Sequence, residues 1–252
     1  PALPDVAGGL FQERYLTEQI EKLVPPDVAF HNEEVSSVDF NNGRITTQKS
    51  TYRCDYLVVA AGAKTDFHGF SQNLDKVRKL DSVEDASQIA ADFPGYLRDT
   101  ESPVAVVVGG GYTGLELACN LRYAGRKFVP RPRVVILELK DKILPFMPDW
   151  VREYMQRKAH ERKIRIVTGV SVERFDGRAI ELSNGATMQN VYLCWATGTC
   201  FPLRDVLGNH EQIGDGRLVV DEYLRIPQHP HVFAAGDAAA MEFGDGPLRK
   251  AV

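Results

Sequence analysis

The sequence contains few cysteines, and their positions exclude two common kinds of small scaffold. Only four occur among 252 residues, Cys54, Cys119, Cys194 and Cys200, and they form neither a C-x-x-C pair nor another metal-ligand spacing. A disulfide-rich secreted domain and a zinc module are therefore not expected. This cysteine usage favours a reducing compartment, and we predict a cytoplasmic protein.

Long apolar runs and an excess of basic charge are also missing. The net charge is −4, and no basic patch is present that would neutralise nucleic-acid phosphates. The longest apolar runs, such as residues 56–63, fall far short of the roughly 18 residues that indicate a membrane span. Nucleic-acid binding and a transmembrane helix are therefore not expected. A hydrophobic content of 44% and a charged content of 25% instead predict a globular chain with a substantial core.

The first hundred residues predict a helix, a small meander, a buried strand and a second helix. Apolar residues at helical spacing predict a helix over 13–24. Short alternating stretches between 27 and 48 predict an antiparallel meander, and the nearly continuous apolar run 54–63 predicts a strand buried on both faces. A capping box that begins at Ser82 predicts the start of the second helix, and Pro94 is expected to end it.

After Pro103 the same order of elements begins again. The second copy predicts strands over 104–108, 134–138, 164–168 and 191–198, helices from 113 and from 149 to 162, and a hairpin between 170 and 182. Compared with it, the first copy lacks an opening strand, a glycine turn and a helix. The chain also starts at Pro1 rather than at methionine, so we expect it to be a piece of a longer protein.

A glycine motif opens the second copy and carries the most specific chemical signal. Gly109, Gly111 and Gly114 form G-x-G-x-x-G between a predicted strand and a predicted helix. The first glycine permits a tight turn, the second lets a pyrophosphate approach the backbone, and the third lets the helix pack on the strand. The pyrophosphate then meets the positive end of the helix dipole. We assign the whole turn to cofactor binding: Gly109, Gly110, Gly111, Tyr112, Thr113 and Gly114.

Glu138 ends the next predicted strand, at the spacing from the glycine motif that is expected of a ribose-binding carboxylate. An acidic residue there accepts hydrogen bonds from the adenosine ribose and repels a 2′-phosphate, which favours NADH over NADPH. Lys140 and Lys142 nearby leave this preference open. The alternative interpretation is a glycine turn that binds nothing, with a carboxylate that only caps a strand.

Two further acidic residues have a functional and a purely structural interpretation. Glu116 follows the glycine motif by two residues, where it either complements the helix dipole or acts as a catalytic group at the nicotinamide. Asp237, after Gly236, sits at a predicted strand-to-helix turn, where it either binds a sugar-like hydroxyl chain or caps the helix. The sequence leaves both pairs of alternatives open.

Five stretches, in their order and spacing, resemble the FAD/NAD(P)-dependent pyridine nucleotide-disulfide oxidoreductase superfamily. They are "DYLVVAAGA", "VVVGGGYTGLELA", "VVILELKDKILP", "VYLCWATGTCFP" and "HVFAAGDAAA". Within it, "GGGYTGLELA" and "PALPDVAGG" are most similar to type II NADH:quinone oxidoreductases. The resemblance implies an α/β fold of two Rossmann-like, three-layer (ββα) dinucleotide-binding domains, the first incomplete. The implied parts are a remnant of the FAD-binding domain (1–102), the NAD-binding domain (103–226) and a return segment of the FAD-binding domain (227–252).

The resemblance also implies cofactor-binding residues outside the glycine turn. Ala196, Thr197 and Gly198 match the loop beside bound NAD, and Asp237 matches the aspartate that binds the flavin ribitol. The Glu that matches Glu116 lies close to the nicotinamide and flavin rings. We add two glycines at the ends of the matching flavin-side strands, Gly62 and Gly236.

The function implied is hydride transfer from NADH to FAD and onward transfer of electrons to a small-molecule acceptor, a quinone. The N-terminal FAD fingerprint and the C-terminal part that holds the quinone site and membrane contact are absent from this chain. The intact parent is expected to bind FAD and NAD(H) and to lie peripherally at the cytoplasmic face of the membrane, with a homodimer left open. Two alternatives remain: a disulfide, peroxide or sulfide reductase of the same superfamily, and an NAD(H)-binding regulatory module without turnover.

Overall fold

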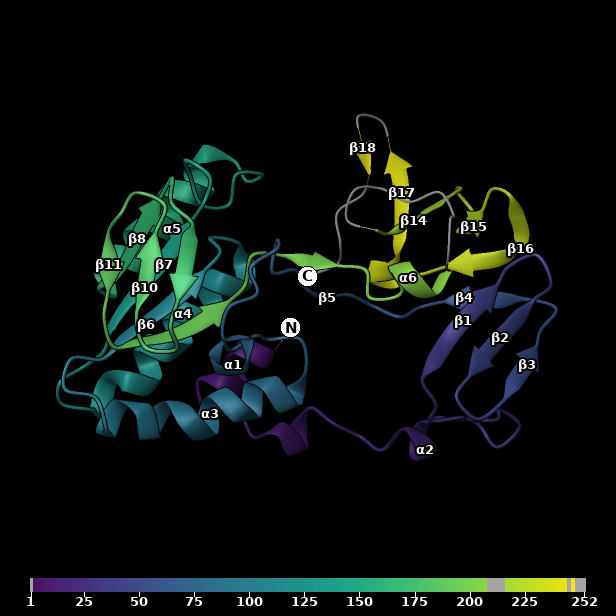
Figure 1. Cartoon of the computed structure of the whole chain (residues 1–252), viewed down its shortest axis with the longest axis horizontal. Helices are drawn as coiled ribbons and strands as arrows, with labels where there is room; N and C mark the ends of the chain where they lie inside the picture. Colours follow the sequence, from purple (N-terminus) through teal and green to yellow (C-terminus); the bar gives the residue numbers. More distant parts are fainter. Residues whose placement is uncertain (1, 208–215, 244–245, 248–252) are drawn as a thin grey trace. The chain divides into compact units, whose positions relative to one another are not determined.

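The computed structural model describes residues 2–207, 216–243 and 246–247, and the chain divides into two compact units (Figure 1). Unit 1 comprises Pro1–Glu18 and Thr65–Gly198, and unit 2 comprises Gln19–Lys64 and Thr199–Val252. These boundaries differ from those expected at residues 102 and 226. The assignment of each part to a cofactor stays a prediction, and the end of the return segment, 248–252, lies outside the described residues.

A four-stranded parallel sheet forms the centre of unit 1. Its strands are β6 (Val104–Val108), β7 (Arg133–Glu138), β8 (Ile164–Thr168) and β12 (Val191–Trp195), in the order β12-β6-β7-β8. At its carboxyl end, Val108 is paired with Trp195 on one side and with Leu137 on the other. The loops that follow these three strands therefore leave the sheet at one edge, next to the point where the strand order reverses.

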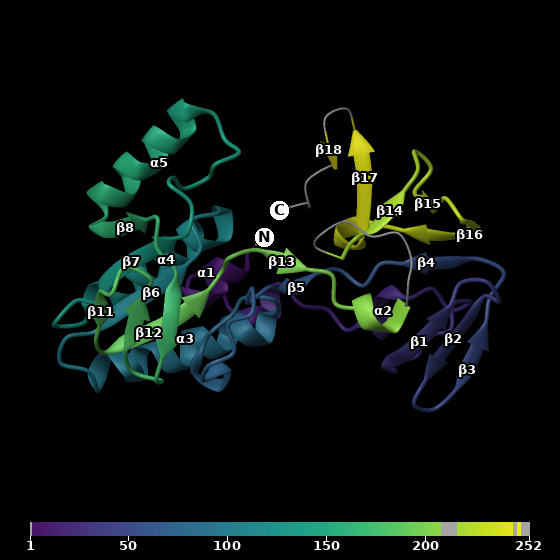
Figure 2. The same ribbon diagram turned by 45° about the horizontal axis from the view of Figure 1, so that its top comes forward.

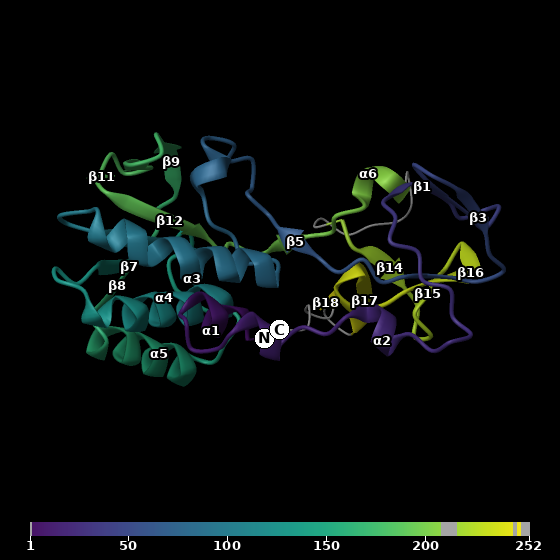
Figure 3. The same ribbon diagram turned by 90° about the horizontal axis from the view of Figure 1, so that it is seen from below.

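The sheet is covered by helices on one face and by a second sheet on the other (Figure 3). The helices are α1 (Leu3–Ala7), α3 (Val83–Arg98), α4 (Tyr112–Ala124) and α5 (Asp149–Glu161), and the second, antiparallel sheet is β9 (Val172–Phe175), β10 (Ile180–Leu182) and β11 (Thr187–Met188). Successive residues of β6 alternate between the two cores, with Ala105 and Val107 among the helices and Val106 and Val108 against the antiparallel sheet. The predicted three-layer ββα fold is confirmed in this unit. Short 3-10 helices η1 (Glu13–Tyr15), η2 (Leu74–Lys76) and η3 (Gly125–Lys127) complete it.

Helix α3 begins as the sequence predicts but does not end where expected. Ser82 and Asp85 form the predicted capping box. The expectation that Pro94 ends the helix is wrong, because the helix continues to Arg98. An interior proline costs roughly 3 kcal/mol in a helix. Phe93 and Leu97, on either side of the proline, are both buried, so packing of this face outweighs that local cost.

The predicted helix over 13–24 is also wrong. This stretch contains only η1 and the single turn α2 (Ile20–Leu23). The apolar residues of the predicted helix face, Leu16, Ile20 and Leu23, are exposed, with 42% exposure for Leu16 and 67% for Leu23. Because a short helix depends on packing of its apolar face, the pattern alone does not form one here.

Unit 2 is built from short strands around a smaller core (Figure 2). The predicted meander is present as β1 (Val35–Asp39), β2 (Arg44–Thr47) and β3 (Thr51–Arg53), although 27–30 form no strand. Two further sheets are β15-β16-β4 and β14-β17-β18. Their strands are β4 (Leu57–Val59), β14 (Leu218–Val220), β15 (Arg225–Ile226), β16 (His229–Ala234), β17 (Ala239–Phe243) and β18 (Gly246–Pro247). The remaining elements are β5 (Lys64–Thr65), β13 (Thr199–Cys200), α6 (Arg204–Leu207) and the 3-10 helix η4 (Gly236–Ala238).

Strand β4 is shorter and less buried than the sequence predicts. The apolar run 54–63 suggested burial on both faces, but Val59 is buried while Val58 is 60% exposed. Among the described residues β4 pairs in parallel with β16, so only part of its surface is covered. Within the same described ranges, no helix has both the length and the apolar character needed to span a bilayer.

Candidate nucleotide-binding site

The glycine turn after β6 has the backbone geometry that its sequence predicts. Gly109 has a φ of +115°, a conformation that side chains other than glycine rarely adopt, and a Cβ there would overlap the Ala196 carbonyl group. A Cβ on Gly114 would overlap the Gly109 carbonyl oxygen. The first glycine therefore permits the turn, and the third permits close packing of α4 on the strand.

Gly111 is different, because nothing in the protein itself requires a glycine there. Its φ of −80° suits any residue, and a Cβ would have no other atom within 4 Å. Gly111 is also the N-cap of α4, and its cap position has no side-chain hydrogen bond to the first turn. The space above this residue is therefore open to an anionic group from outside the chain, with unfilled backbone N–H groups beside it.

Glu138 connects the end of β7 to the glycine turn. Its Oε2 accepts a hydrogen bond from the Gly110 N–H at 2.7 Å, and its Oε1 accepts one from the Lys140 N–H at 2.9 Å. The carboxylate is thereby fixed at the sheet edge, and each oxygen keeps capacity for another donor. A role in binding ribose stays a prediction, but the position fits it.

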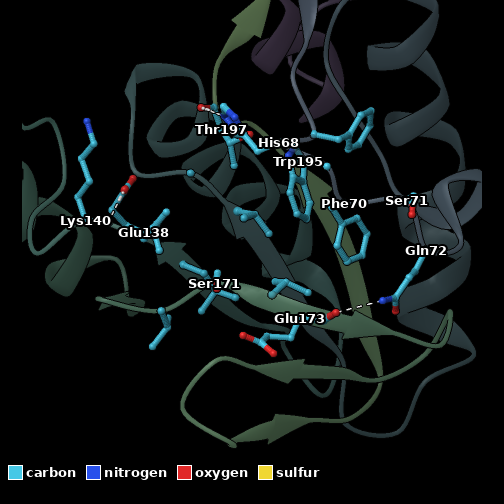
Figure 4. Close-up of a pocket in the computed structure, with 18 residues that line it drawn as sticks. His68, Phe70, Ser71, Gln72, Glu138, Lys140, Ser171, Glu173, Trp195 and Thr197 are labelled. Atoms are coloured by element: carbon cyan, nitrogen blue, oxygen red, sulfur yellow. Dashed lines mark hydrogen bonds between the residues drawn. The ribbon is translucent and has the colours of Figure 1, made fainter.

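A cavity of about 730 Å³ lies at this edge, wholly within unit 1 (Figure 4). Its walls include the ends of β6, β7 and β12 and the chain between β8 and β9. The described residues that line it are Phe67, His68, Gly69, Phe70, Ser71, Gln72, Val108, Gly109, Leu137, Glu138, Leu139, Lys140, Val170, Ser171, Val172, Glu173, Trp195 and Thr197. A mostly apolar cleft with a few polar groups at a strand-order reversal is typical of a nucleotide site in an α/β fold.

Residues 66–72 form one wall of this cavity, and the sequence patterns did not predict it. Phe70 stacks on Trp195 with 4.7 Å between ring centroids, and Trp195 donates its Nε1–H to the Asp66 carbonyl oxygen at 3.2 Å. Gln72 donates to the Glu173 carbonyl oxygen at 3.1 Å, which fastens the other end to β9. The sequence signal for this wall was a cluster of two phenylalanines and a histidine around a glycine. It stands in a stretch without strand or helix periodicity.

The loop after β12 reaches the same cavity. Ala196 donates its N–H to the Val108 carbonyl oxygen at 2.7 Å, which holds the loop against the glycine turn. Thr197 lines the cavity, and its hydroxyl donates to the Asp66 carbonyl oxygen at 2.7 Å. Gly198 follows with a φ of +118°. The structure thus brings together the glycine turn, Glu138 and Thr197.

Tyr112, Thr113 and Glu116 do not line this cavity. The Tyr112 hydroxyl donates to the Met147 sulfur at 2.9 Å, so its side chain packs away from the turn, and Thr113 is exposed. Glu116 is also exposed, one turn further along α4. The pKa of Glu116 is raised, first because the surrounding protein desolvates its carboxyl and second because Asp5 in α1 adds a negative charge. Its predicted catalytic role stays a prediction.

Unit 2 brings together the other three predicted residues. β4 and β16 are parallel, with Val59 paired to Ala234, so the turns that contain Gly62 and Gly236 leave from one edge. Both glycines have positive φ, +64° and +63°, and open space at their Cβ positions. Asp237 follows, and its Oδ1 is buried without a hydrogen-bond partner. Because a buried carboxylate oxygen needs a donor, this orphan atom fits a hydroxyl group of a bound ligand such as a ribityl chain.

Comparisons with known proteins found a family model, curated relatives and solved structures that are similar to this chain. The family model described as "Pyridine nucleotide-disulphide oxidoreductase" matches residues 4–250. An NADH dehydrogenase-like protein of Mycobacterium tuberculosis is 30% identical over 240 residues, which cover 88% of this chain and 58% of that protein. A type II NADH:quinone oxidoreductase of Staphylococcus haemolyticus is 24% identical over 261 residues, which cover 95% of this chain and 64% of that enzyme.

A solved structure shares the fold. The structure of NDH2 from Plasmodium falciparum in complex with NADH superposes with a TM-score of 0.82 at 21% identity, covering 96% of this chain and 57% of that one. The chain thus spans somewhat over half the length of that enzyme and of the mycobacterial relative.

Proposed function

The chain belongs to the pyridine nucleotide-disulphide oxidoreductase family, and from this premise we propose that it is the nucleotide-binding part of an NADH-dependent flavoprotein reductase that delivers electrons to a quinone. The observation that carries the proposal is the open space at Gly111, in the same turn in which Gly110 donates its N–H to the Glu138 carboxylate and Gly109 lines the cavity of about 730 Å³. A glycine that the fold does not need is best explained by a ligand that approaches the backbone there.

The residues of unit 1 bind and orient the dinucleotide in this proposal. The N–H groups of the first turn of α4 receive the pyrophosphate above Gly111, where the helix dipole favours negative charge. Glu138 accepts the ribose hydroxyls of the adenosine half and disfavours a 2′-phosphate, which gives NADH the advantage over NADPH. Thr197 and Trp195 bound the cavity at the end of β12 and exclude water from that side.

The residues of unit 2 hold the flavin. Asp237 Oδ1 accepts a ribityl hydroxyl, and Gly62 and Gly236 leave room for the backbone to approach the cofactor. When bound, FAD supplies the hydride acceptor and the store of reducing equivalents for the second substrate. In this proposal Glu116 handles a proton at its carboxyl, whose pKa is raised by desolvation and by the charge of Asp5.

A quinone acceptor is proposed from the names of the relatives, which include NADH:quinone oxidoreductases. Two of the four thiols do not support the disulfide or persulfide alternative, although a persulfide reductase of A. fulgidus shares the fold with a TM-score of 0.78 at 24% identity. Cys194 is fully buried, and burial raises the pKa of its thiol. Burial also raises the pKa of Cys119, so neither sulfur favours the nucleophilic thiolate.

The test is an anaerobic visible spectrum of the purified chain, supplemented with FAD, before and after addition of NADH. We expect a bound flavin band that NADH bleaches and that a water-soluble quinone restores faster than a disulfide does. A chain that binds NADH but no flavin would instead support a nucleotide-binding module without turnover.

The matched control is Gly111→Ala. A Cβ at this position touches no protein atom, so the variant is expected to fold and keep flavin. Its flavin should then be bleached by dithionite but poorly by NADH. Equal bleaching of both proteins by NADH would place the nicotinamide cofactor elsewhere and overturn the proposal.

A further inference from the structure

A groove of about 380 Å³ lies in unit 1, lined by the end of α1, by α3 and by the junction of α4 with η3. Its floor is apolar and includes the buried Ala7 and Phe93, while Leu10 at its rim is 45% exposed. The thirteen residues of α4 place about 20 Å between this groove and the glycine turn at the other end of the helix. The groove is therefore separate from the proposed nucleotide site.

Pro94 gives this groove an acceptor for a backbone N–H. It lies inside α3 and has no N–H, so the carbonyl oxygen of Ala90, four residues earlier, lacks its usual helical donor. Both residues line the groove. Gly9, which also lines it, has open space at its Cβ position. A ligand with N–H donors, such as an extended peptide, satisfies the Ala90 carbonyl better than a lipid chain does.

Two cations, Arg126 and Lys127, line the same groove, and none of its described lining residues is acidic. The Arg126 guanidinium lies 3.5 Å from the centroid of the Tyr123 ring, and its Nη1 donates to the Tyr123 carbonyl oxygen at 2.8 Å. Tyr123 is itself a lining residue. The Arg126 charge is therefore held at the groove, where it can attract an anionic group.

The positive charge continues along the loop that joins α4 to β7. Arg131 and Arg133 are exposed there, and Pro132 between them packs against Gly125. Within the described part of the chain, no salt bridge involves these two arginines or the two cations of the groove. Residues 117–137 include no acidic residue. The net charge of −4 conceals this local excess, and the expectation of no basic patch overlooked it.

We propose that this groove is a docking site for an acidic peptide segment of a partner protein. Apolar side chains of the segment pack on Phe93 and Leu10, and a backbone N–H of the segment meets the Ala90 carbonyl oxygen. Its carboxylates pair with Arg126 and Lys127, because complementary charge steers a partner to an exposed surface. Nucleic acid fits less well, since its phosphates would use the cations and leave the apolar floor without a contact.

The test measures binding of fluorescein-labelled peptides to the full chain by fluorescence anisotropy. The acidic probe is a peptide of about twelve residues in which single leucines separate pairs of glutamates. One comparison peptide has glutamine in place of every glutamate, and the other has serine in place of every leucine. Each comparison peptide should bind about tenfold more weakly than the acidic probe, because it loses either the charges or the apolar contacts. Raising the salt from about 50 mM to about 500 mM should weaken the acidic probe about fivefold.

The double variant Arg126→Glu, Lys127→Glu should weaken the acidic probe about tenfold and change the binding of the glutamine peptide little. The matched control is Lys163→Glu, Arg165→Glu, which reverses two exposed cations at the start of β8 that do not line the groove. It should change binding of the acidic probe less than about twofold, because salt screens distant exposed charges. Circular dichroism verifies that both variants are folded.

Four results would overturn the inference. The first is no binding of the acidic probe at low salt. The second is equal weakening by the two double variants, which would indicate a general attraction to positive charge. The third is equal binding of the serine peptide, which would leave the apolar floor without a role. The fourth is tighter binding of a single-stranded oligonucleotide of about twelve nucleotides, lost in Arg126→Glu, Lys127→Glu, which would assign the cations to nucleic acid.

Discussion

Two hydrophobic strands of this chain, β6 and β4, are each followed by a turn of small residues, yet they have different surroundings. All five residues of β6 are buried, because β12 and β7 flank it and both faces of its sheet are covered. Only Val59 of the three residues of β4 is buried, and the described part of the chain supplies β16 as its partner. Similar local sequence therefore gives a fully buried strand in unit 1 and a partly covered one in unit 2.

The glycines in the turns after these strands also differ between the two units. Gly109 and Gly114 in unit 1 are required by the protein's own backbone, whereas Gly62 and Gly236 in unit 2 adopt positive φ beside empty space. Unit 1 has its turn fixed before any ligand arrives. Unit 2 keeps a buried oxygen at Asp237 without a hydrogen-bond partner among the described residues, so this atom can still accept a donor from outside the chain.

The largest effect is expected from Gly114→Ala. The added Cβ would overlap the Gly109 carbonyl oxygen, so the helix must move from the strand, and we expect a loss of about 3 kcal/mol in the free energy of unfolding. Urea denaturation followed by circular dichroism measures it. Gly111→Ala in the same turn is the control and should change stability by less than about 1 kcal/mol. Similar stability losses in both variants would contradict the distinction between them.

Asp237→Asn should separate stability from flavin binding in unit 2. The substitution removes a charge whose Oδ1 has no donor in the described structure, so the flavin-free chain should gain about 1 kcal/mol in the free energy of unfolding. The affinity for FAD, measured by fluorescence quenching, should fall about tenfold, or about 1.4 kcal/mol. A destabilised flavin-free variant would mean that the carboxylate already has a partner.

Asp5→Asn should change how stability depends on pH. The pKa of Glu116 is raised above 4.5 by partial desolvation of its carboxyl and by Asp5, so the folded protein holds this proton more tightly than the unfolded chain does. The resulting stability is present below pH 4.5 and is lost as the pH rises through the folded pKa. In Asp5→Asn this loss should shrink.

Carbon-detected NMR titration of the Glu116 carboxyl measures the effect directly. Asparagine at position 5 can still accept the hydrogen bond that Asn120 donates to Asp5 at 3.0 Å, so the docking of α1 on α4 is kept. An unchanged Glu116 pKa in a folded variant would show that desolvation, without the charge of Asp5, raises the pKa.

The smallest effect is expected from Leu23→Asp. Leu23 is 67% exposed in unit 2, so the substitution should change the free energy of unfolding by no more than about 0.5 kcal/mol. Thermal unfolding measures it. A loss above about 2 kcal/mol in the free energy of unfolding would instead support the predicted amphipathic helix over 13–24 with a packed apolar face.

Sequence patterns predicted the parts of the fold whose local and tertiary preferences agree. The capping box at Ser82, the strand over 104–108 and the glycine turn each formed as predicted. Pro94 shows the opposite case, because buried neighbours override its local effect. The wall 66–72 was not predictable from periodicity, since hydrogen bonds to residues about 100 positions away in the chain hold it, as with Gln72 and Glu173.

That wall also decides how the nucleotide-binding unit could be isolated for study. Its cavity is lined by residues on both sides of the glycine motif, from Phe67 to Thr197, and Asp66 ties the earlier stretch to the later one. A gene fragment that starts at Pro103, where the second copy begins, would encode the glycine turn without the cavity wall formed by residues 66–72. A continuous fragment from Thr65 through Gly198 would contain every described residue that lines the cavity.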